Sequence, residues 1–166
     1  PDHYEDHWVC EYWQADEGRW VMVDPQLDAF QREALSIQFD TMDMPPGQFI
    51  PAGQGWQMCR QGQADPDSFG IFDMHGMWFI RGNLVRDLAA LNKVELLPWD
   101  GWGLGDKDEQ TLTPEDLALL DRAAALTLAG NESFAEMRAF YQAEEYLRVP
   151  PVIRSYSDKG MQLVDL

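Results

Sequence analysis

Two residues near the N-terminus have the types and spacing for acid–base chemistry. His7 opens an aromatic and β-branched run over 7–13, and Asp24 closes a second such run over 19–24. A short polar loop that ends in Gly18 joins the runs, which predicts a β-hairpin. A hairpin can bring both side chains to the same end of one face. A histidine oriented by a carboxylate is two-thirds of a Cys-His-Asp or Ser-His-Asp centre.

The pairing register of the hairpin decides whether this contact forms. Side chains alternate along a strand, so a slip of one residue would put the pair on opposite faces. In one working register Gln14 pairs with Arg19, and His7 is the diagonal neighbour of Asp24. In the other the two residues lie directly opposite each other. Both registers turn Cys10 to the other face, so it is not expected to be the partner of His7.

The sequence over residues 6–25 resembles a known family. From His7 it contains His-Trp-x-x-Glu-x-Trp, a short acidic loop and Gly-Arg-Trp-x-x-Val-Asp-Pro. This pattern is similar to the His and Asp motifs of the transglutaminase-like superfamily, whose members are papain-like cysteine enzymes. The segments 78–83 and 95–100 look similar to an uncharacterised bacterial branch. The resemblance implies His7 as general base and Asp24 as its orienting carboxylate, and assigns no catalytic role to the downstream segments.

The cysteine nucleophile of that family would lie on a helix upstream of the two strands. None of the six residues that precede His7 is a cysteine. We therefore expect the chain, which begins at Pro1, to be a fragment, with its nucleophile outside it and no activity alone. Cys59 is a conceivable substitute, but free cysteines are more often small buried hydrophobes.

The acidic composition restricts the partners that we expect. The chain has 166 residues and a net charge of −17, which would repel nucleic acid and anionic membranes. The charge is explained either by a highly soluble or halophilic surface or by a basic protein substrate. A hydrophobic fraction of 45% is typical of a globular chain with a core.

The cysteine count and hydropathy bear on the compartment. Two cysteines do not form a disulfide framework, so Cys10 and Cys59 are read as free thiols in a reducing, cytoplasmic environment. No apolar run approaches the ~18 residues of a membrane-spanning helix.

Other residues with chemical potential are interpreted more simply. His3, His7 and His75 do not have spacing that fixes a third ligand, so neither a metal nor a cofactor is expected. Glu95 and Asp100 flank a Pro-Trp turn, where solvated or capping carboxylates are the default.

Tryptophans are candidates for a sugar or peptide groove, although most are expected to be core residues. The candidates for a substrate groove are Trp8, Trp99 and Trp102, and the last two lie in a glycine-rich loop that suits a lid or groove wall. Trp13 and Trp20 belong to the expected hairpin.

Helical patterns dominate after the hairpin. Periodicity and capping signals predict helices over 25–36, 52–63, 77–92, 113–129 and 133–148. The segments 40–51 and 97–107 are expected to be irregular, and the tail from Val149 extended and partly loose. This is an α+β pattern: residues 1–26 form the antiparallel hairpin of a transglutaminase-like sheet, and residues 27–166 pack on it as a helical extension in one compact domain.

Two functions are consistent with these patterns. The first is acyl transfer through a thioester, either amide hydrolysis or transglutamination, on a peptide or small amide. The second is a non-catalytic binding or assembly module on the same fold. A lone hairpin is marginal in water, and its open edge invites strand addition by a partner or oligomerisation.

Overall fold

The computed structural model describes residues 3–157 and 159–166, and it is of the α+β class with the expected hairpin. The first two residues of the expected hairpin segment lie outside the described residues. The chain forms two compact units: the hairpin unit, Asp6–Ile50, and the helical unit, which joins the residues up to Glu5 to Pro51–Leu166. The boundary expected after residue 26 falls inside the hairpin unit.

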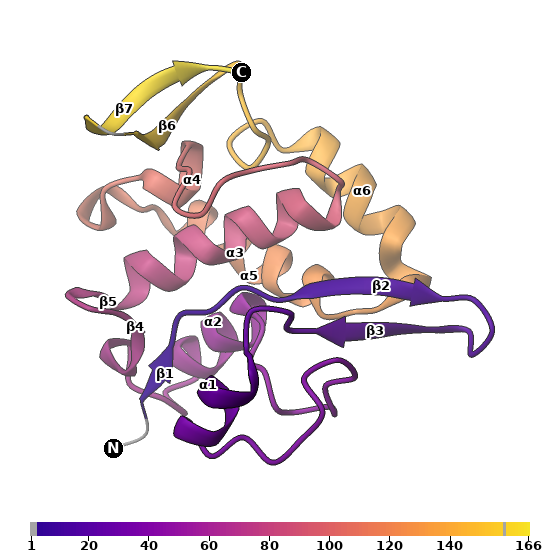
Figure 1. Ribbon diagram of the computed structural model, residues 1–166. Helices are drawn as coiled ribbons and strands as arrows, with labels where there is room; N and C mark the ends of the chain where they lie inside the picture. Colours follow the sequence, from indigo (N-terminus) through magenta and orange to yellow (C-terminus); the bar gives the residue numbers. More distant parts are fainter. Residues whose placement is uncertain (1–2, 158) are drawn as a thin grey trace. The chain divides into compact units, whose positions relative to one another are not determined.

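The hairpin unit is built on an antiparallel strand pair (Figure 1). Strand β2 spans Cys10–Gln14 and β3 spans Arg19–Val23. Gln14 pairs with Arg19, which is the first of the two registers that keep His7 and Asp24 on one face. Gly18 has a φ of +63°, a left-handed conformation that favours glycine and closes the four-residue loop. The alternation pattern therefore predicted both the hairpin and its register.

An irregular segment runs along the outer edge of β3. Met44 N–H donates to the Met22 carbonyl at 2.9 Å. The Arg19 guanidinium donates hydrogen bonds to both carboxylate oxygens of Asp43, at 2.9 and 2.7 Å. This hydrogen bonding lowers the pKa of Asp43, because it favours the charged form of the carboxyl. The segment 41–44 is thus held to β3 without being a strand.

The first helix of the chain differs from its prediction. α1 spans Ala29–Ala34, because a capping box between Asp28 and Gln31 starts it later than residue 25. The sequence places Phe30 and Leu35 on one apolar side of this helix, but neither packs: Phe30 is 77% exposed and Leu35 63% exposed. An amphipathic pattern identified the helix but not whether its apolar side meets a neighbour.

The helical unit contains three small β-elements near its start. Strand β1, Tyr4–Glu5, runs parallel to β4, Phe69–Ile71. Strand β5, Met74–His75, pairs antiparallel with β4 and completes the sheet order β1-β4-β5. A 3-10 turn, η1, covers Pro66–Ser68 and leads into β4. Strands β4 and β5 were not expected, and β1 lies in the segment 1–26 that was expected to be extended, but it pairs with β4 instead of joining the hairpin.

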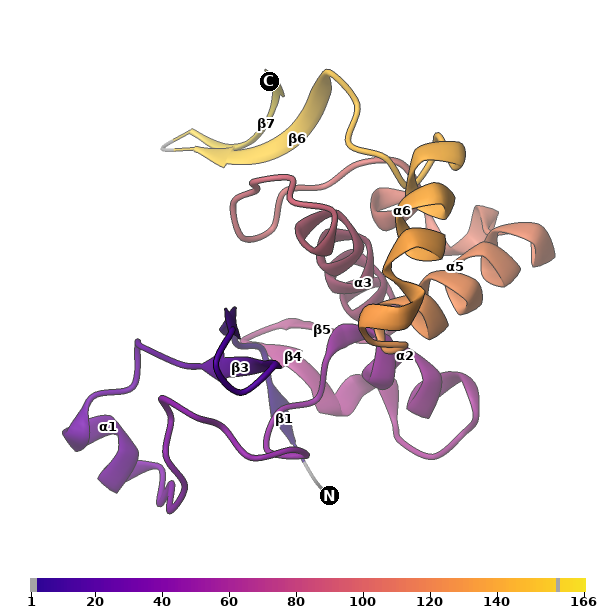
Figure 2. The same cartoon turned by 90° about the vertical axis from the view of Figure 1, so that its right-hand side faces the viewer.

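The core of the helical unit surrounds α3, Met77–Leu91, which matches the helix predicted over 77–92. Leu84, Val85 and Leu88 are completely or almost completely buried. Helices α2, Ala52–Arg60, and α5, Pro114–Thr127, contact it and each other. Figure 2 shows α6, Phe134–Ala143, beside α5, which it contacts.

Glycine at position 53 permits close contact between α2 and α5. A Cβ atom there would come within 2.4 Å of Thr127 Oγ1 and 2.9 Å of the Ala124 carbonyl oxygen. Glycine lowers helix propensity, but here it removes a steric barrier between two helices. The close approach places Trp56 in the core, where it is fully buried.

The start of α5 confirms its capping prediction. Thr113 Oγ1 accepts the Asp116 N–H, and the Asp116 carboxylate accepts the Thr113 N–H. Lys107 Nζ also lies 2.5 Å from Asp116 Oδ2. The Lys107 hydrogen bond and then the Thr113 backbone bond lower the pKa of Asp116.

Three later segments correct the sequence expectations. The expected loop 97–107 contains a short helix, α4, Gly103–Asp106, and a 3-10 turn, η2, Glu109–Thr111, follows it. Another turn, η3, Asn131–Ser133, precedes α6, Phe134–Ala143, which ends before residue 148 because Glu144 is extended. The sequence places Phe134, Met137, Phe140 and Tyr141 on one side of α6, and all of them except Phe134 are buried.

The tail forms a second hairpin instead of a loose extension. β6, Val152–Ser157, pairs antiparallel with β7, Gly160–Asp165. Gly101 and Arg154 exchange backbone hydrogen bonds of 2.7 and 2.9 Å, and Ile153 is buried. The two strands are neighbours in the sequence, so the hairpin itself is a local feature, and only its alignment on Gly101 depends on a distant partner. Within the described residues, no helix has the length and apolarity needed to cross a membrane.

Asp121 links α2 to α5, and its replacement by asparagine gives a pH-dependent prediction. Its carboxylate accepts Trp56 Nε1 at 2.7 Å and Arg60 Nε and Nη2 at 3.1 Å each. Burial raises the pKa of Asp121, but the hydrogen bonds from Arg60 and Trp56 outweigh it and lower the pKa overall.

A lowered folded pKa stabilises the protein at pH above the unfolded carboxyl value of about 3.9. We expect Asp121→Asn to reduce stability at pH 7 by about 1 kcal/mol or less, since the site is solvent-screened. The difference in stability between the variant and the unchanged protein should shrink as the pH falls through the lowered pKa of Asp121. Thermal unfolding at pH 7 and pH 3 tests this, with Asp16→Asn in the hairpin loop as control. An equal deficit at both pH values would contradict it.

Candidate functional site

Asp24 is a buried carboxylate at the end of β3. Its side chain is 1% exposed, and Oδ1 accepts the Gln26 N–H at 3.0 Å across Pro25. An aspartate that accepts the N–H two residues on forms an Asx turn, so the local sequence Asp-Pro-Gln fixes this side chain. Its own N–H donates to the Thr41 carbonyl at 2.7 Å. The carboxylate is therefore anchored on both its backbone and its side chain.

His7 completes the pair. Its Nε2 lies 2.6 Å from Asp24 Oδ2, and its side chain is 34% exposed. The contact expected from the strand alternation is confirmed, although His7 lies three residues before the start of β2. The buried end of the pair thus belongs to the carboxylate and the accessible end to the imidazole.

The geometry determines the tautomer of His7. A carboxylate only accepts hydrogen bonds, so Nε2 carries the proton in this contact. Nδ1 then presents the lone pair, and within the described residues no hydrogen bond is made to Nδ1. An imidazole held in this orientation presents Nδ1 as the atom that can take a proton from a thiol or hydroxyl.

Neither cysteine of the chain is an activated thiol partner for this base. Cys10 pairs with Val23 on β3, so strand alternation turns it away from the face of Asp24. Cys59 lies half-buried in α2, where burial first and the charge of Asp65 second raise the pKa of its thiol. A raised pKa keeps a thiol protonated and weakly nucleophilic. Both thiols are free in the structure.

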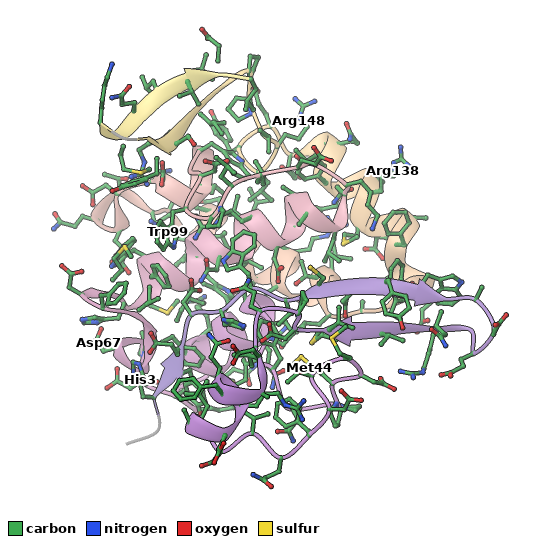
Figure 3. The ribbon with its side chains drawn as sticks, in the orientation of Figure 1. His3, Met44, Asp67, Trp99, Arg138 and Arg148 are labelled. Carbon is green, nitrogen blue, oxygen red and sulfur yellow. The ribbon has the colours of Figure 1, made fainter. Side chains whose placement is uncertain are left out.

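The expected groove tryptophans have different environments. Trp8, in the hairpin unit, is half-buried. Trp102 is only 4% exposed and donates from Nε1 to the Leu147 carbonyl at 3.0 Å, so it is a core residue instead of a groove wall. Trp99, labelled in Figure 3, has a φ of +70° and its ring meets the edge of Tyr156.

The histidines do not cluster. His3 pairs with Glu5 at 2.8 Å and His75 with Asp67 at 3.4 Å, while His7 has Asp24. In the part of the chain that the structure describes, no three metal-ligating side chains come together.

Glu95 is solvated, as the default expected, but Asp100 is neither solvated nor at the N-terminus of a helix. Asp100 is buried and accepts the Leu97 N–H at 2.8 Å and the Ser155 hydroxyl. Glu95 is exposed.

Sequence reasoning missed two residues that support the pair, Gln26 and Thr41. The Gln26 contact could have been predicted, because the Asp-Pro-x pattern is typical of an Asx turn. Thr41 is buried and follows an irregular segment, so nothing local marks its carbonyl as the partner of Asp24.

The site therefore consists of a base, its orienting carboxylate and their backbone anchors. Comparison with protein families, curated proteins and solved structures finds no match. The interpretation of the site rests on its own geometry.

The tautomer of His7 can be measured directly. We expect ¹H–¹⁵N correlation spectra at neutral pH to show His7 protonated at Nε2, because Asp24 accepts only from that nitrogen. Asp24→Ala should remove this preference, while His75, whose Nδ1 faces Asp67, stays unchanged. A His7→Ala variant assigns the signal. Protonation of His7 at Nδ1, insensitive to Asp24→Ala, would contradict the described geometry.

Proposed function

We propose that His7 and Asp24 are the general base and orienting carboxylate of a transglutaminase-like Cys-His-Asp centre that performs acyl transfer. The observation that supports this most is the buried Asp24 carboxylate bound to Nε2 of a partly exposed imidazole. That arrangement leaves Nδ1 as the proton acceptor. Because neither Cys10 nor Cys59 suits the role, the proposal places the nucleophilic thiol on a segment outside this chain.

The proposed reaction follows from these roles. The thiol gives its proton to Nδ1 of His7, and its sulfur bonds to the carbonyl carbon of an amide. The C–N bond then breaks, and the leaving amine takes the proton from His7. The resulting thioester is attacked by water or by an amine, which gives its proton to His7, and the thiol is released. Asp24 stabilises the imidazolium that forms in both halves of the reaction.

The substrate would be a peptide or small amide. Two free thiols are consistent with the proposal of a reducing, cytoplasmic compartment. The net charge of −17 argues against nucleic acid as a partner.

The test compares this chain with a gene product that includes upstream sequence with a cysteine, as the proposal requires. We expect the chain alone to lack turnover of an activated ester that depends on His7, because neither a base nor its orienting carboxylate forms a thioester. A product that carries an upstream cysteine should hydrolyse the ester or incorporate an amine into glutamine peptides. In that product His7→Ala should lower kcat at least about 10³-fold, and Asp24→Asn about 10³- to 10⁴-fold.

The two cysteines of this chain supply the controls. Cys10→Ser and Cys59→Ser should leave the activity of the longer product unchanged. Turnover by the chain alone that disappears in Cys59→Ser would show that the nucleophile had been assigned wrongly. Turnover that survives His7→Ala would reject the pair as a catalytic unit.

One observation favours a binding or assembly module as the second candidate. Within the described residues no strand pairs with the outer edge of β2, and the hairpin carries exposed Tyr12, Trp13 and Trp20. Exposed strand edges and aromatic side chains suit pairing with another chain. If this is the function, sedimentation should show self-association or partner binding that Trp13→Lys weakens. A monomer at all concentrations that also binds no partner would reject it.

A further inference from the structure

A pocket of about 360 Å³ lies in the helical unit, and neither His7 nor Asp24 lines it. It is lined by Trp78 and Arg81 of α3, by the stretch 105–110 and by Arg154 of β6. Figure 1 shows α4 between α3 and the β6–β7 hairpin, and the elements are joined by the α3–α4 contact and the Gly101–Arg154 bridge. All of its walls belong to one compact unit.

The most informative side chain of the pocket is Arg81, which is 3% exposed. Nε donates to the Gly105 carbonyl at 3.4 Å, and Nη2 donates to the Lys107 carbonyl. Within the described residues no carboxylate lies at hydrogen-bond distance, and Nη1 makes no hydrogen bond. Burial lowers the pKa of Arg81, because the charged guanidinium has lost water. The charges of Glu109, Asp106, Asp108 and Asp116 act against this loss without outweighing it, and none of these carboxylates hydrogen-bonds the guanidinium, so an anion bound in direct contact would stabilise it further.

The other cations of the pocket already have carboxylate partners. Arg154 binds Asp106 through Nε at 2.6 Å and through Nη2. Lys107 binds Asp116 at 2.5 Å. Among the described lining residues, Arg81 is therefore the cation that can receive an anionic group.

The rim of the pocket has the opposite character. Asp108 and Glu109 are exposed, and within the described residues neither forms an ion pair. Asp108 accepts the Gln110 N–H at 2.9 Å, which fixes its carboxylate at the start of η2. Trp78 adds a flat aromatic wall that is 43% exposed. The pocket thus has a guanidinium in its floor, carboxylates at its rim and an aromatic face beside them.

We propose that this pocket binds a small zwitterion of the α-amino acid type. Its carboxylate would meet the Arg81 guanidinium, its ammonium group would face Asp108 and Glu109, and its side chain would lie against Trp78. A purely anionic ligand is repelled by the rim and by the net charge of −17, and a purely cationic ligand is repelled by Arg81. A zwitterion complements both ends, and a fork-shaped guanidinium suits a carboxylate.

Calorimetry on the full chain with three related probes tests the charge requirement. L-phenylalanine has both charged groups, 3-phenylpropionate lacks the ammonium group and phenethylamine lacks the carboxylate. We expect L-phenylalanine to bind with a Kd of about 1 mM, a strength reasonable for so few contacts, and at least about tenfold more tightly than either analogue. Equal binding of either analogue, or no binding of L-phenylalanine, would overturn the proposal.

Matched variants test the position of the ligand. Trp78→Ala should weaken binding several-fold, while Trp13→Ala, which removes a similarly exposed tryptophan from the hairpin unit, should not. Glu109→Gln should weaken binding of L-phenylalanine but not of 3-phenylpropionate. Glu132→Gln, which alters the equivalent first-turn acid of η3, should change neither.

Arg81→Gln should abolish binding of L-phenylalanine. Because Arg81 also donates to two backbone carbonyls, the substitution can unfold the protein, so the unfolding temperature of the Arg81→Gln variant is measured in parallel. If that variant does not fold, the exposed Trp78 and Glu109 variants still decide the proposal. Unchanged binding in both of them would overturn it.

Discussion

The hairpin unit depends on the compensation of one buried charge, the carboxylate of Asp24. An ionised carboxylate is tolerated inside a protein only where hydrogen bonds replace its water. Here the Gln26 N–H and the His7 imidazole supply them, and the backbone of Asp24 is held by Thr41. Few apolar side chains of this unit are buried, so these polar contacts and the Arg19–Asp43 fork hold its irregular part to β3. The orientation of the imidazole is therefore a property of the whole unit.

The helical unit follows a different principle, since its stability comes from the buried apolar face of α3. Two arginines nevertheless lie within that buried helix, and both donate to backbone carbonyls: Arg81 to Gly105 and Lys107, and Arg86 to Asp100. These bonds tie the connection after α3 back onto the helix that it leaves. Short α4 and its flanking turns are thus positioned by side chains of α3, which gives the irregular stretch a defined shape.

Local patterns predicted the parts of the fold that local physics determines. The period of Leu84 and Leu88 marked α3, and the threonine cap at 113 marked α5. Strand alternation placed His7 near Asp24. The remaining features depend on distant partners: β6 is aligned by Gly101, and Trp102 is buried against a carbonyl forty-five positions later. The prediction of a packed apolar side for α1 was wrong for the same reason. Periodicity shows which side of a helix is apolar, but not whether another element covers it.

The tryptophans across the first strand pair have an optical consequence. The rings of Trp13 and Trp20 lie 5.6 Å apart between centroids at an interplanar angle of 64°, close enough for their electronic transitions to couple. Coupled indoles give a paired circular-dichroism signal that vanishes when the rings separate. The strand pair thus carries a natural spectroscopic reporter of its own integrity.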